Sequence, residues 1–122
     1  LMMLRKIQVS GSRVLVLGLA FKEDCPDLRN SRVIDIINEL QSYSVLVDVY
    51  DPWVAAADAR HEYGIDLVQA PEPGKYDAVI IAVGHDEFRK LGEQGLRALC
   101  QPDGVLYDVK YLLPAATVDG RL

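Results

Sequence analysis

Reactive side chains are concentrated in one short segment that follows an apolar run. They are Lys22, Glu23, Asp24, Cys25, Asp27 and Arg29. Lys22 and Arg29 flank a stretch that leads into a helical pattern. A lysine point charge, an arginine fork and the free N–H groups of a helix N-terminus suit a diphosphate. The alternative is that both cations pair with the neighbouring carboxylates as a solvated cluster, and composition does not decide between the two.

The same segment lacks the phosphate loop of a dinucleotide site. That loop needs glycines in the pattern GxGxxG, so that the backbone can approach the pyrophosphate. Here only Gly18 is present, and Phe21 and Lys22 follow it. Asp51 stands where an acid would bind a ribose, but the better interpretation is that it makes the turn before Pro52. The sequence has the outline of a Rossmann unit without its phosphate loop.

The elements that must position these residues alternate between buried strands and amphipathic helices. Strands are predicted at 13–19, 45–50, 77–83 and 105–109, with a short edge strand at 65–68. Helices are predicted at 31–42 and 54–63, and one or two short helices over 86–91 and 93–100. A loop is expected at 71–74, a turn at 102–104 and an irregular tail at 112–122. Apolar residues 33, 36, 37 and 40 lie on one face of the first helix, and Gly64 is suited to end the second.

This alternation is typical of a Rossmann-like α/β fold, with a doubly wound, mainly parallel sheet in a single domain. Right-handed crossovers place the carboxyl ends of all strands at one edge of such a sheet. Residues expected at that edge are Phe21-Lys22, Asp51, Gly84-His85 and Lys110. The edge is therefore the predicted site.

Composition excludes several functional classes. The chain has 122 residues and a formal net charge of -5 without a long basic run, which argues against a nucleic-acid partner. No apolar stretch approaches the roughly 20 residues that span a bilayer, and no signal peptide is visible at residues 1–11. Cys25 and Cys100 lack CxxC spacing, which predicts a cytoplasmic location rather than a disulfide framework or zinc site. Residues 1–12 are expected to be the tail of an upstream helix and a linker, with one domain over 13–122.

The segment LGLAFKEDCPDLRNS at residues 17–31 resembles the FKxxxxDxRxS signature that opens the C-terminal domain of UDP-glucose/GDP-mannose dehydrogenases. Residues 49–52 (VYDP), 76–85 (YDAVIIAVGH) and 107–110 (YDVK) fit the rest of that domain in order. The resemblance covers about residues 13–114. The CPDLRNS, DPW and GHDEF segments are most similar to the branch that acts on UDP-N-acetylglucosamine or UDP-N-acetylgalactosamine.

The resemblance implies a two-step, NAD-dependent oxidation of the sugar C6 alcohol to a carboxylate, for surface or capsular polysaccharide. In the family, the NAD-binding domain and the nucleophilic cysteine lie upstream. This chain is therefore expected to be the UDP-sugar-binding part and to be inactive alone. The resemblance implies that Phe21 and Lys22 contact the UDP-sugar, and that Arg29 reaches the NAD pyrophosphate across the cleft between domains.

Further expectations follow from the same resemblance. Lys110 stands where the family places a cation near the nucleotide sugar, often as arginine. Asp27 and Ser31 are expected to shape the loop, with Asn30 or Ser31 capping the first helix. The implied partners are the UDP-sugar, the N-terminal NAD-binding domain of the same chain, and further copies in a homo-oligomer.

Other reactive side chains have simpler interpretations. Cys25 has no histidine base near it in sequence and is expected to be a loop residue, and Cys100 is expected in the core. His61 and His85 have no metal-ligand spacing, so we expect a helix-surface residue and a structural hydrogen bond. Trp53 is expected to pack over the turn after the second strand.

A receiver-like phosphoacceptor signalling domain is the alternative from another functional class. It also has a doubly wound sheet, acids after the first strand and a lysine after the last, which Glu23-Asp24 and Lys110 would supply. Its phosphoacceptor acid ends the third strand, whereas Asp51 ends the second predicted strand. A non-catalytic scaffold, which would bind neither UDP nor Mg²⁺, is the third hypothesis.

Overall fold

The computed structural model describes residues 11–20, 24, 26–27, 31–108 and 120–121 of the protein. Its elements in chain order are β1 (Arg13–Leu17), α1 (Val33–Ser42), β2 (Leu46–Tyr50), α2 (Ala56–Tyr63), β3 (Tyr76–Ile81), α3 (Asp86–Arg97), β4 (Cys100–Asp108) and β5 (Gly120–Arg121). The predicted alternation of strands and helices is confirmed.

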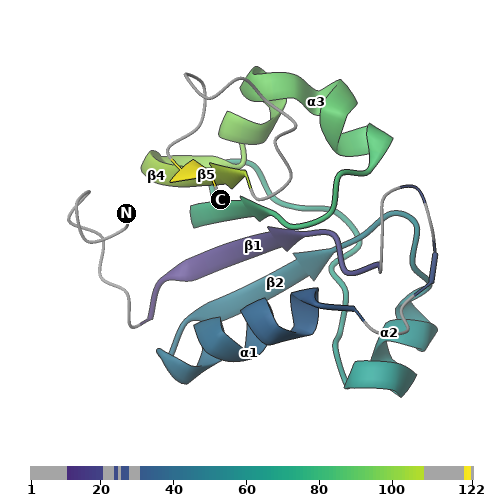
Figure 1. Ribbon diagram of the computed structural model, residues 1–122. Coiled ribbons are helices and arrows are strands. Elements are labelled where there is room, and N and C mark those ends of the chain that lie inside the picture. Colours follow the sequence, from purple (N-terminus) through teal and green to yellow (C-terminus); the bar gives the residue numbers. More distant parts are fainter. Residues whose placement is uncertain (1–10, 21–23, 25, 28–30, 109–119, 122) are drawn as a thin grey trace.

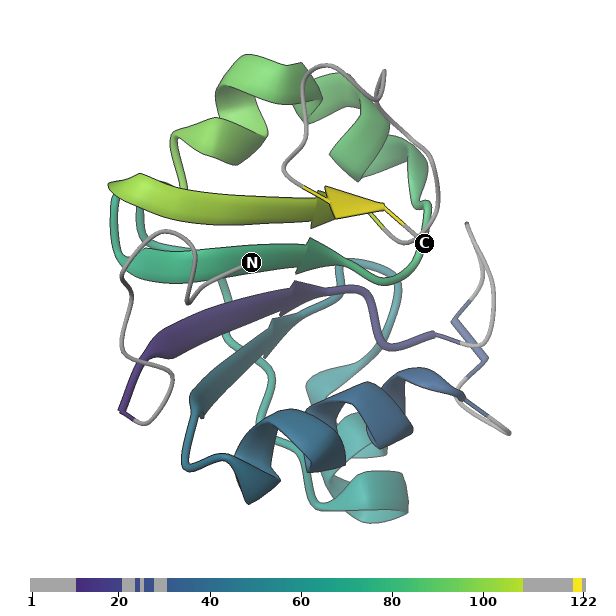
Figure 2. The same ribbon diagram turned by 60° about the vertical axis from the view of Figure 1, so that its left-hand side comes forward.

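The five strands form one parallel sheet in the order β2-β1-β3-β4-β5. The strand arrowheads in Figure 2 accordingly point toward the same edge. In this doubly wound order, the strand sequence reverses between β1 and β3, and ligands of such folds bind beyond the carboxyl ends at that point. The predicted fold is confirmed, and the reversal point identifies where a site is expected.

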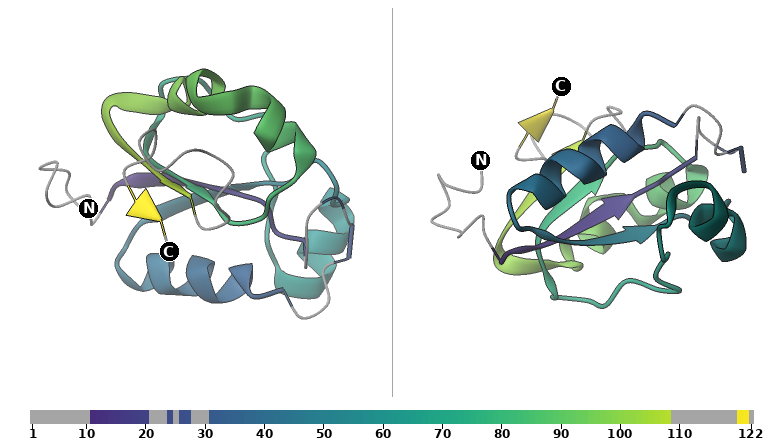
Figure 3. Two further views of the ribbon diagram at one scale, coloured as in Figure 1. Left: turned by 45° about the horizontal axis from the view of Figure 1, so that its top comes forward. Right: turned by 90° about the horizontal axis from the view of Figure 1, so that it is seen from below.

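Helices cover both faces of the sheet, which explains the apolar character of its central strands (Figure 1). Val14 and Val16 of β1 belong to a core shared with α1 and α2. Leu15 and Leu17 point the other way into a core shared with α3. Figure 3 shows α1 and α3 on opposite sides of the sheet. Because all four of these β1 side chains are fully buried, β1 is the centre of the fold.

The central strands end two residues earlier than predicted. β1 stops at Leu17 rather than residue 19, and β3 stops at Ile81 rather than residue 83. The carbonyl of Leu17 accepts hydrogen bonds from both Ala82 N, at 3.0 Å, and Val83 N, at 3.2 Å. This shared acceptor ends the regular ladder, although residues 18–20 and 82–83 remain buried. Apolar sequence therefore continues past the end of each strand.

Three further boundaries differ from the sequence predictions. Residues 65–68 make only an isolated bridge, between Val49 and Leu67, and not an edge strand. β4 begins at Cys100, so the predicted turn at 102–104 lies inside a strand that shifts register against β3. A Cβ on Gly104 would lie 2.7 Å from the Cβ of Cys100, which shows how tightly the chain folds on itself there. The predicted irregular tail contains β5, which pairs with β4.

The helices agree with the predictions except at their ends. α1 begins at Val33 and α2 at Ala56, each two residues later than predicted. Gly64 follows α2 with φ of 67°, which confirms its predicted role as a left-handed terminator. α3 contains a break at Gly92, where φ is 65° and ψ is -174°, so the prediction of two short helices describes it well.

Candidate functional site

The chain makes a close crossing where it leaves β1, and this crossing shapes the carboxyl edge of the sheet. Gly18 has φ of +102°, and a Cβ added to it would lie 2.5 Å from the Cβ of Val83. The N–H of Gly18 donates to the carbonyl of Tyr50 at 2.8 Å. Glycine is therefore needed here so that the segments after β1 and β3 can pack together.

Asp51 accepts hydrogen bonds from the backbone N–H groups that follow β1. Its Oδ2 accepts the backbone N–H of Leu19 at 2.7 Å and of Ala20 at 2.9 Å, while Oδ1 accepts that of Trp53 at 2.8 Å. The N–H groups beyond β1 thus point to a protein carboxylate. The described residues at the carboxyl end of β1 do not fit a nicotinamide dinucleotide, in agreement with the missing glycine pattern.

The turn assigned to Asp51 from the sequence is confirmed only in part. The contact with Trp53 N is a turn contact within two residues. The other oxygen joins β2 to the segment after β1, because parallel pairing of β1 and β2 brings their carboxyl ends together. Burial alone would raise the pKa of Asp51, but hydrogen bonds from His85 and from the three backbone N–H groups hold it below its ordinary value.

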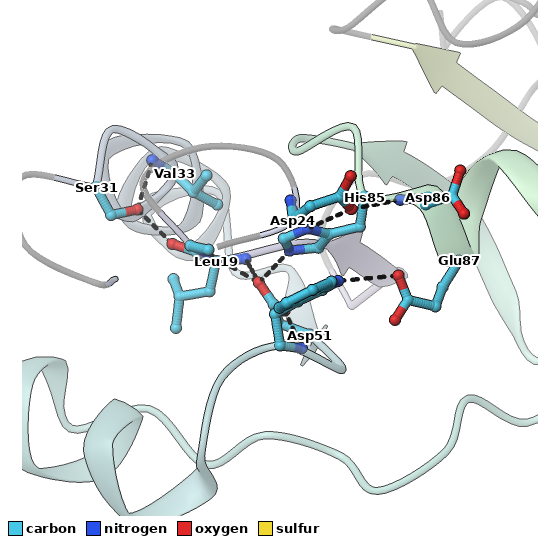
Figure 4. Close-up of polar contacts among 10 residues, drawn as sticks. Leu19, Asp24, Ser31, Val33, Asp51, His85, Asp86 and Glu87 are labelled. Carbon is cyan, nitrogen blue, oxygen red and sulfur yellow. Dashed lines mark hydrogen bonds and ion pairs between the residues drawn. The ribbon is translucent and has the colours of Figure 1, made fainter. Parts of the chain in front are cut away.

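His85 lies against Asp51 and uses both ring nitrogens (Figure 4). Its Nε2 is 2.9 Å from Asp51 Oδ2, and its Nδ1 accepts the backbone N–H of Asp24 at 2.8 Å. Because Nδ1 is an acceptor, the neutral ring carries its proton on Nε2, and Nε2–H donates a hydrogen bond to Asp51. The predicted structural hydrogen bond of His85 is confirmed.

Asp24 completes a reciprocal contact with the start of α3. Its backbone N–H binds the His85 ring, and its Oδ1 accepts the backbone N–H of Asp86 at 2.8 Å. A carboxylate at this position also interacts favourably with the positive end of the helix dipole. Asp24 has φ of 51°, a left-handed conformation that is uncommon outside glycine and that aspartate tolerates better than most residues. One hydrogen bond therefore holds the backbone of Asp24, and the other holds its side chain.

Aromatic rings enclose the imidazole of His85. Trp53 stacks on it with ring centroids 6.0 Å apart, and Phe88 lies 5.5 Å away on a tilted plane. The indole Nε1 of Trp53 donates to Glu87 Oε1 at 2.9 Å, which ties the turn after β2 to α3. Trp53 therefore packs against His85 and Glu87 at the start of α3 rather than over the turn after β2 as predicted, and 38% of it remains exposed.

Ser31 fastens the other end of the segment between β1 and α1. Its hydroxyl donates to the carbonyl of Leu19 at 2.7 Å and accepts the N–H of Val33 at 3.3 Å. Its own N–H donates to the hydroxyl of Tyr63 at 3.3 Å. The N-cap of α1 is Arg32, and no side chain caps it, so the predicted cap at Ser31 is wrong by one residue. Ser31 nevertheless shapes the start of the helix, since its hydroxyl accepts the N–H of Val33, the first residue of α1.

This arrangement can hold a loop but cannot perform acid–base chemistry through His85. A catalytic imidazole needs a nitrogen that can exchange a proton with substrate, whereas both nitrogens of His85 face protein groups and the side chain is fully buried. Within the described part of the chain, no group of three or more histidine, cysteine, aspartate or glutamate residues could hold a metal ion. The same part contains no helix long and apolar enough to cross a membrane.

The structure brings together two of the residues expected at the edge, Asp51 and His85. The residues that the resemblance assigns to ligands lie outside the described residues; they are Phe21, Lys22, Arg29 and Lys110. Asn30 and Cys25 also lie outside them. His61 is exposed on α2, as predicted. Cys100 is buried as predicted, but at the start of β4 rather than at a helix end.

Sequence reasoning missed the link between Asp24, Asp51 and His85. His85 is 61 positions from Asp24 and 34 positions from Asp51, so no local spacing connects the three residues. The usable signal was the placement of polar residues directly after neighbouring strands. Reading it requires the strand order, because β1 lies between β2 and β3.

The chain is similar to known proteins in both sequence and fold. Residues 15–115 match the model of the UDP-glucose/GDP-mannose dehydrogenase family, UDP binding domain. The chain is 54% identical over 121 residues to UDP-N-acetyl-D-glucosamine 6-dehydrogenase of Pseudomonas aeruginosa, covering 99% of this chain and 29% of that protein. It is 50% identical over 121 residues to the Salmonella typhi enzyme of the same name, covering 99% and 28%. The chain thus spans less than a third of these relatives.

Solved structures give the same assignment of fold. The UDP-D-ManNAc dehydrogenase of Pyrococcus horikoshii superposes with a TM-score of 0.75 at 22% identity, over 98% of this chain and 27% of that one. The UDP-glucose dehydrogenase of Pyrobaculum islandicum superposes with a TM-score of 0.69 at 28% identity, over 92% and 25%. Both similarities therefore involve about a quarter of a larger protein.

Proposed function

Because this chain belongs to the UDP-glucose/GDP-mannose dehydrogenase family, as its UDP binding domain, we propose that it binds the nucleotide end of a UDP-sugar at the carboxyl edge of its sheet. The observation that carries the proposal is the position of the family match. It begins in β1 and includes the segment from β1 to α1, Asp51 and His85. The described contacts hold Asp24 and Ser31, which stand two positions beyond Lys22 and Arg29 respectively in the sequence.

The whole protein is proposed to oxidise the C6 alcohol of a UDP-N-acetylhexosamine to a carboxylate with NAD. The support for the sugar class is the identity of 54% and 50% to two UDP-N-acetyl-D-glucosamine 6-dehydrogenases. A role in surface polysaccharide, which the resemblance implies, is part of the same proposal; Protein CapL of Staphylococcus aureus is a further relative, 37% identical over 107 residues. The uronic acid product would then serve as a building block for such a polymer.

The assignment of the two substrates to two separate domains is part of this proposal. Residues 13–122 form the C-terminal, UDP-sugar-binding domain, and NAD is bound mainly by an N-terminal domain of the same polypeptide. The closed crossing at Gly18 and the occupied N–H groups of Leu19 and Ala20 support an NAD site elsewhere. Phe21, Lys22 and Lys110 contact the UDP-sugar in this proposal, while Arg29 contacts the NAD pyrophosphate. Alone, the chain would then oxidise no sugar.

Two observations weigh against the receiver alternative. The third strand, β3, is followed by Ala82, Val83 and Gly84, so no acid ends it where a phosphoacceptor would stand. The carboxylates of Asp24 and Asp51 are also engaged with backbone N–H groups rather than grouped around a space for Mg²⁺. The family match agrees with this reading.

Calorimetric titration of the 122-residue chain tests the nucleotide proposal. We expect saturable binding of UDP and none of Mg²⁺ with acetyl phosphate. Binding of the second pair without the first would contradict the proposal. In the full-length protein, NADH formation should be faster with UDP-N-acetylglucosamine or UDP-N-acetylgalactosamine than with UDP-glucose, and the reverse order would contradict the assigned sugar class.

A further inference from the structure

His85 joins three segments that are distant in the sequence. It precedes α3, its Nε2 contacts Asp51 after β2, and its Nδ1 accepts the N–H of Asp24 in the segment after β1. Its side chain is fully buried, whereas 43% of the Asp24 side chain is exposed. A rigid, buried group thus holds an exposed part of the chain (Figure 4).

The contact constrains Asp24 in two ways. The ring fixes the direction of its N–H, and the N–H of Asp86 fixes its carboxylate. Together these hydrogen bonds maintain the left-handed φ of 51°, which costs free energy in an unsupported aspartate. His85 and Asp86, 61 and 62 residues away in the sequence, therefore hold Asp24 at the start of α3.

The orientation of His85 is itself set by Asp51. The buried carboxylate accepts a hydrogen bond from Nε2–H. Nδ1 then carries no proton, and its lone pair can accept the N–H of Asp24. The opposite tautomer would place two N–H groups against each other at Asp24 and leave Nε2 without a proton for Asp51. Among the described residues, the ring of His85 links Asp51 to Asp24.

We propose that His85 is a positioning residue for the UDP-sugar: its neutral ring holds the backbone of Asp24, which stands two positions beyond Lys22 in the sequence. This proposal rests on the proposed function and goes beyond it. His85 does not touch the ligand. It acts through the backbone of Asp24, whose N–H its Nδ1 accepts.

Two substitutions separate the two contacts of the ring. In His85→Gln, the side-chain amide reaches the Nε2 position and can donate to Asp51, but the acceptor for Asp24 N–H is lost. In His85→Asn, the amide oxygen stands near Nδ1 and can still accept from Asp24, while the contact with Asp51 is lost. His61→Gln is the matched control, because His61 is exposed on α2.

The test is the dissociation constant of UDP for the 122-residue chain and these three variants. Loss of one hydrogen bond predicts about three- to tenfold weaker binding by His85→Gln, a smaller effect of His85→Asn, and no change in His61→Gln. Equal affinities of wild type and His85→Gln would overturn the positioning role. A wild-type chain that binds no UDP would overturn the proposed function, and the positioning role with it.

A measurement on the unchanged chain decides the matter if His85→Gln does not fold. The ¹⁵N resonances of the His85 ring should report an unprotonated Nδ1 and a protonated Nε2. Saturation with UDP should shift the Nδ1 resonance and the amide signal of Asp24 together. A ring whose resonances stay unchanged while UDP binds elsewhere in the spectrum would contradict the proposal.

Discussion

The carboxylate of Asp51 lies 2.9 Å from Nε2 of His85, and both side chains are completely withdrawn from solvent. Each belongs to the turn that follows a strand flanking β1, on opposite sides of it. The pair spans the end of β1, where Asp51 also accepts the backbone N–H groups of Leu19 and Ala20. The pair therefore lies where the strand order reverses, and it links the segments that follow β1, β2 and β3.

Asp51→Asn should lower the free energy of unfolding by about 1–3 kcal/mol at neutral pH, because at least one buried N–H loses its acceptor. The difference should shrink in acid. The pKa of Asp51 is lowered in the folded protein, so between that pKa and the unfolded value of about 3.9 the unfolded state binds more protons. Stability from Asp51 is complete above that range and is lost as the pH falls through the folded pKa.

Urea titrations of wild type and Asp51→Asn between neutral pH and about pH 3 measure this difference. A difference in unfolding free energy that stays constant over the whole pH range would mean that the charge of Asp51 does not contribute to stability. A gap that widens in acid would contradict the direction of the pKa shift.

Gly18→Ala should be much more destabilising than Gly74→Ala. Both glycines have positive φ, at +102° and +69°, so both variants include the backbone cost of about 1–2 kcal/mol. Only at Gly18 does the new Cβ meet other atoms, and the overlap with Val83 should add about 1–3 kcal/mol. Equal midpoints of urea unfolding for the two variants would show that the segments after β1 and β3 separate easily.

Ser31→Ala should cost about 1–2 kcal/mol of stability, because it removes the contacts to Leu19 O and Val33 N that join β1 to α1. Ser42→Ala is the matched control. Its hydroxyl donates to Glu39 O at 2.6 Å on an exposed part of the same helix, so a change within about 0.5 kcal/mol is expected. Thermal unfolding of both variants measures the two losses of stability, and equal losses would contradict the role of Ser31 in joining β1 to α1.

Lys22→Ala and Arg29→Ala should have opposite preferences in the full-length enzyme. Lys22→Ala is expected to weaken UDP-sugar binding by about one to two decades, the value of a lost charge-assisted contact, with a smaller effect on NAD. Arg29→Ala should instead raise the KM for NAD more than that for the sugar, with little change in melting temperature. Steady-state kinetics with both substrates measure the two ratios, and matching losses in both variants would contradict the separate roles.

The sequence predicted the framework well because burial on both faces leaves a strong local pattern. β1 and β3 read as continuous apolar runs, and Val33, Ile36, Ile37 and Leu40 do pack on one face of α1. Ends of elements were less accurate because they depend on long-range contacts. The apolar run after Leu17 gave no sign that its carbonyl would accept from both Ala82 and Val83.

The site was predicted as a location but not as a set of contacts. Placement of polar residues after successive strands was enough to put Asp51 and His85 at one edge. Their pairing depends on β2 and β3 both flanking β1, and the link to Asp24 depends on a left-handed residue that no local pattern indicated. The ligand roles of Phe21, Lys22, Arg29 and Lys110 remain predictions from the resemblance.

The most direct test of the account is a UDP titration of the ¹⁵N-labelled 122-residue chain, followed by its backbone amide signals. We predict saturable shifts at the carboxyl edge, at Ala20, Asp24 and Asp86, because Asp24 and its hydrogen-bond partners lie there. Amides at the opposite edge, such as those of Arg13 and Tyr76 at the starts of β1 and β3, should stay in place. Shifts confined to that opposite edge, or no saturable shift at all, would contradict the assignment of this edge as the nucleotide site.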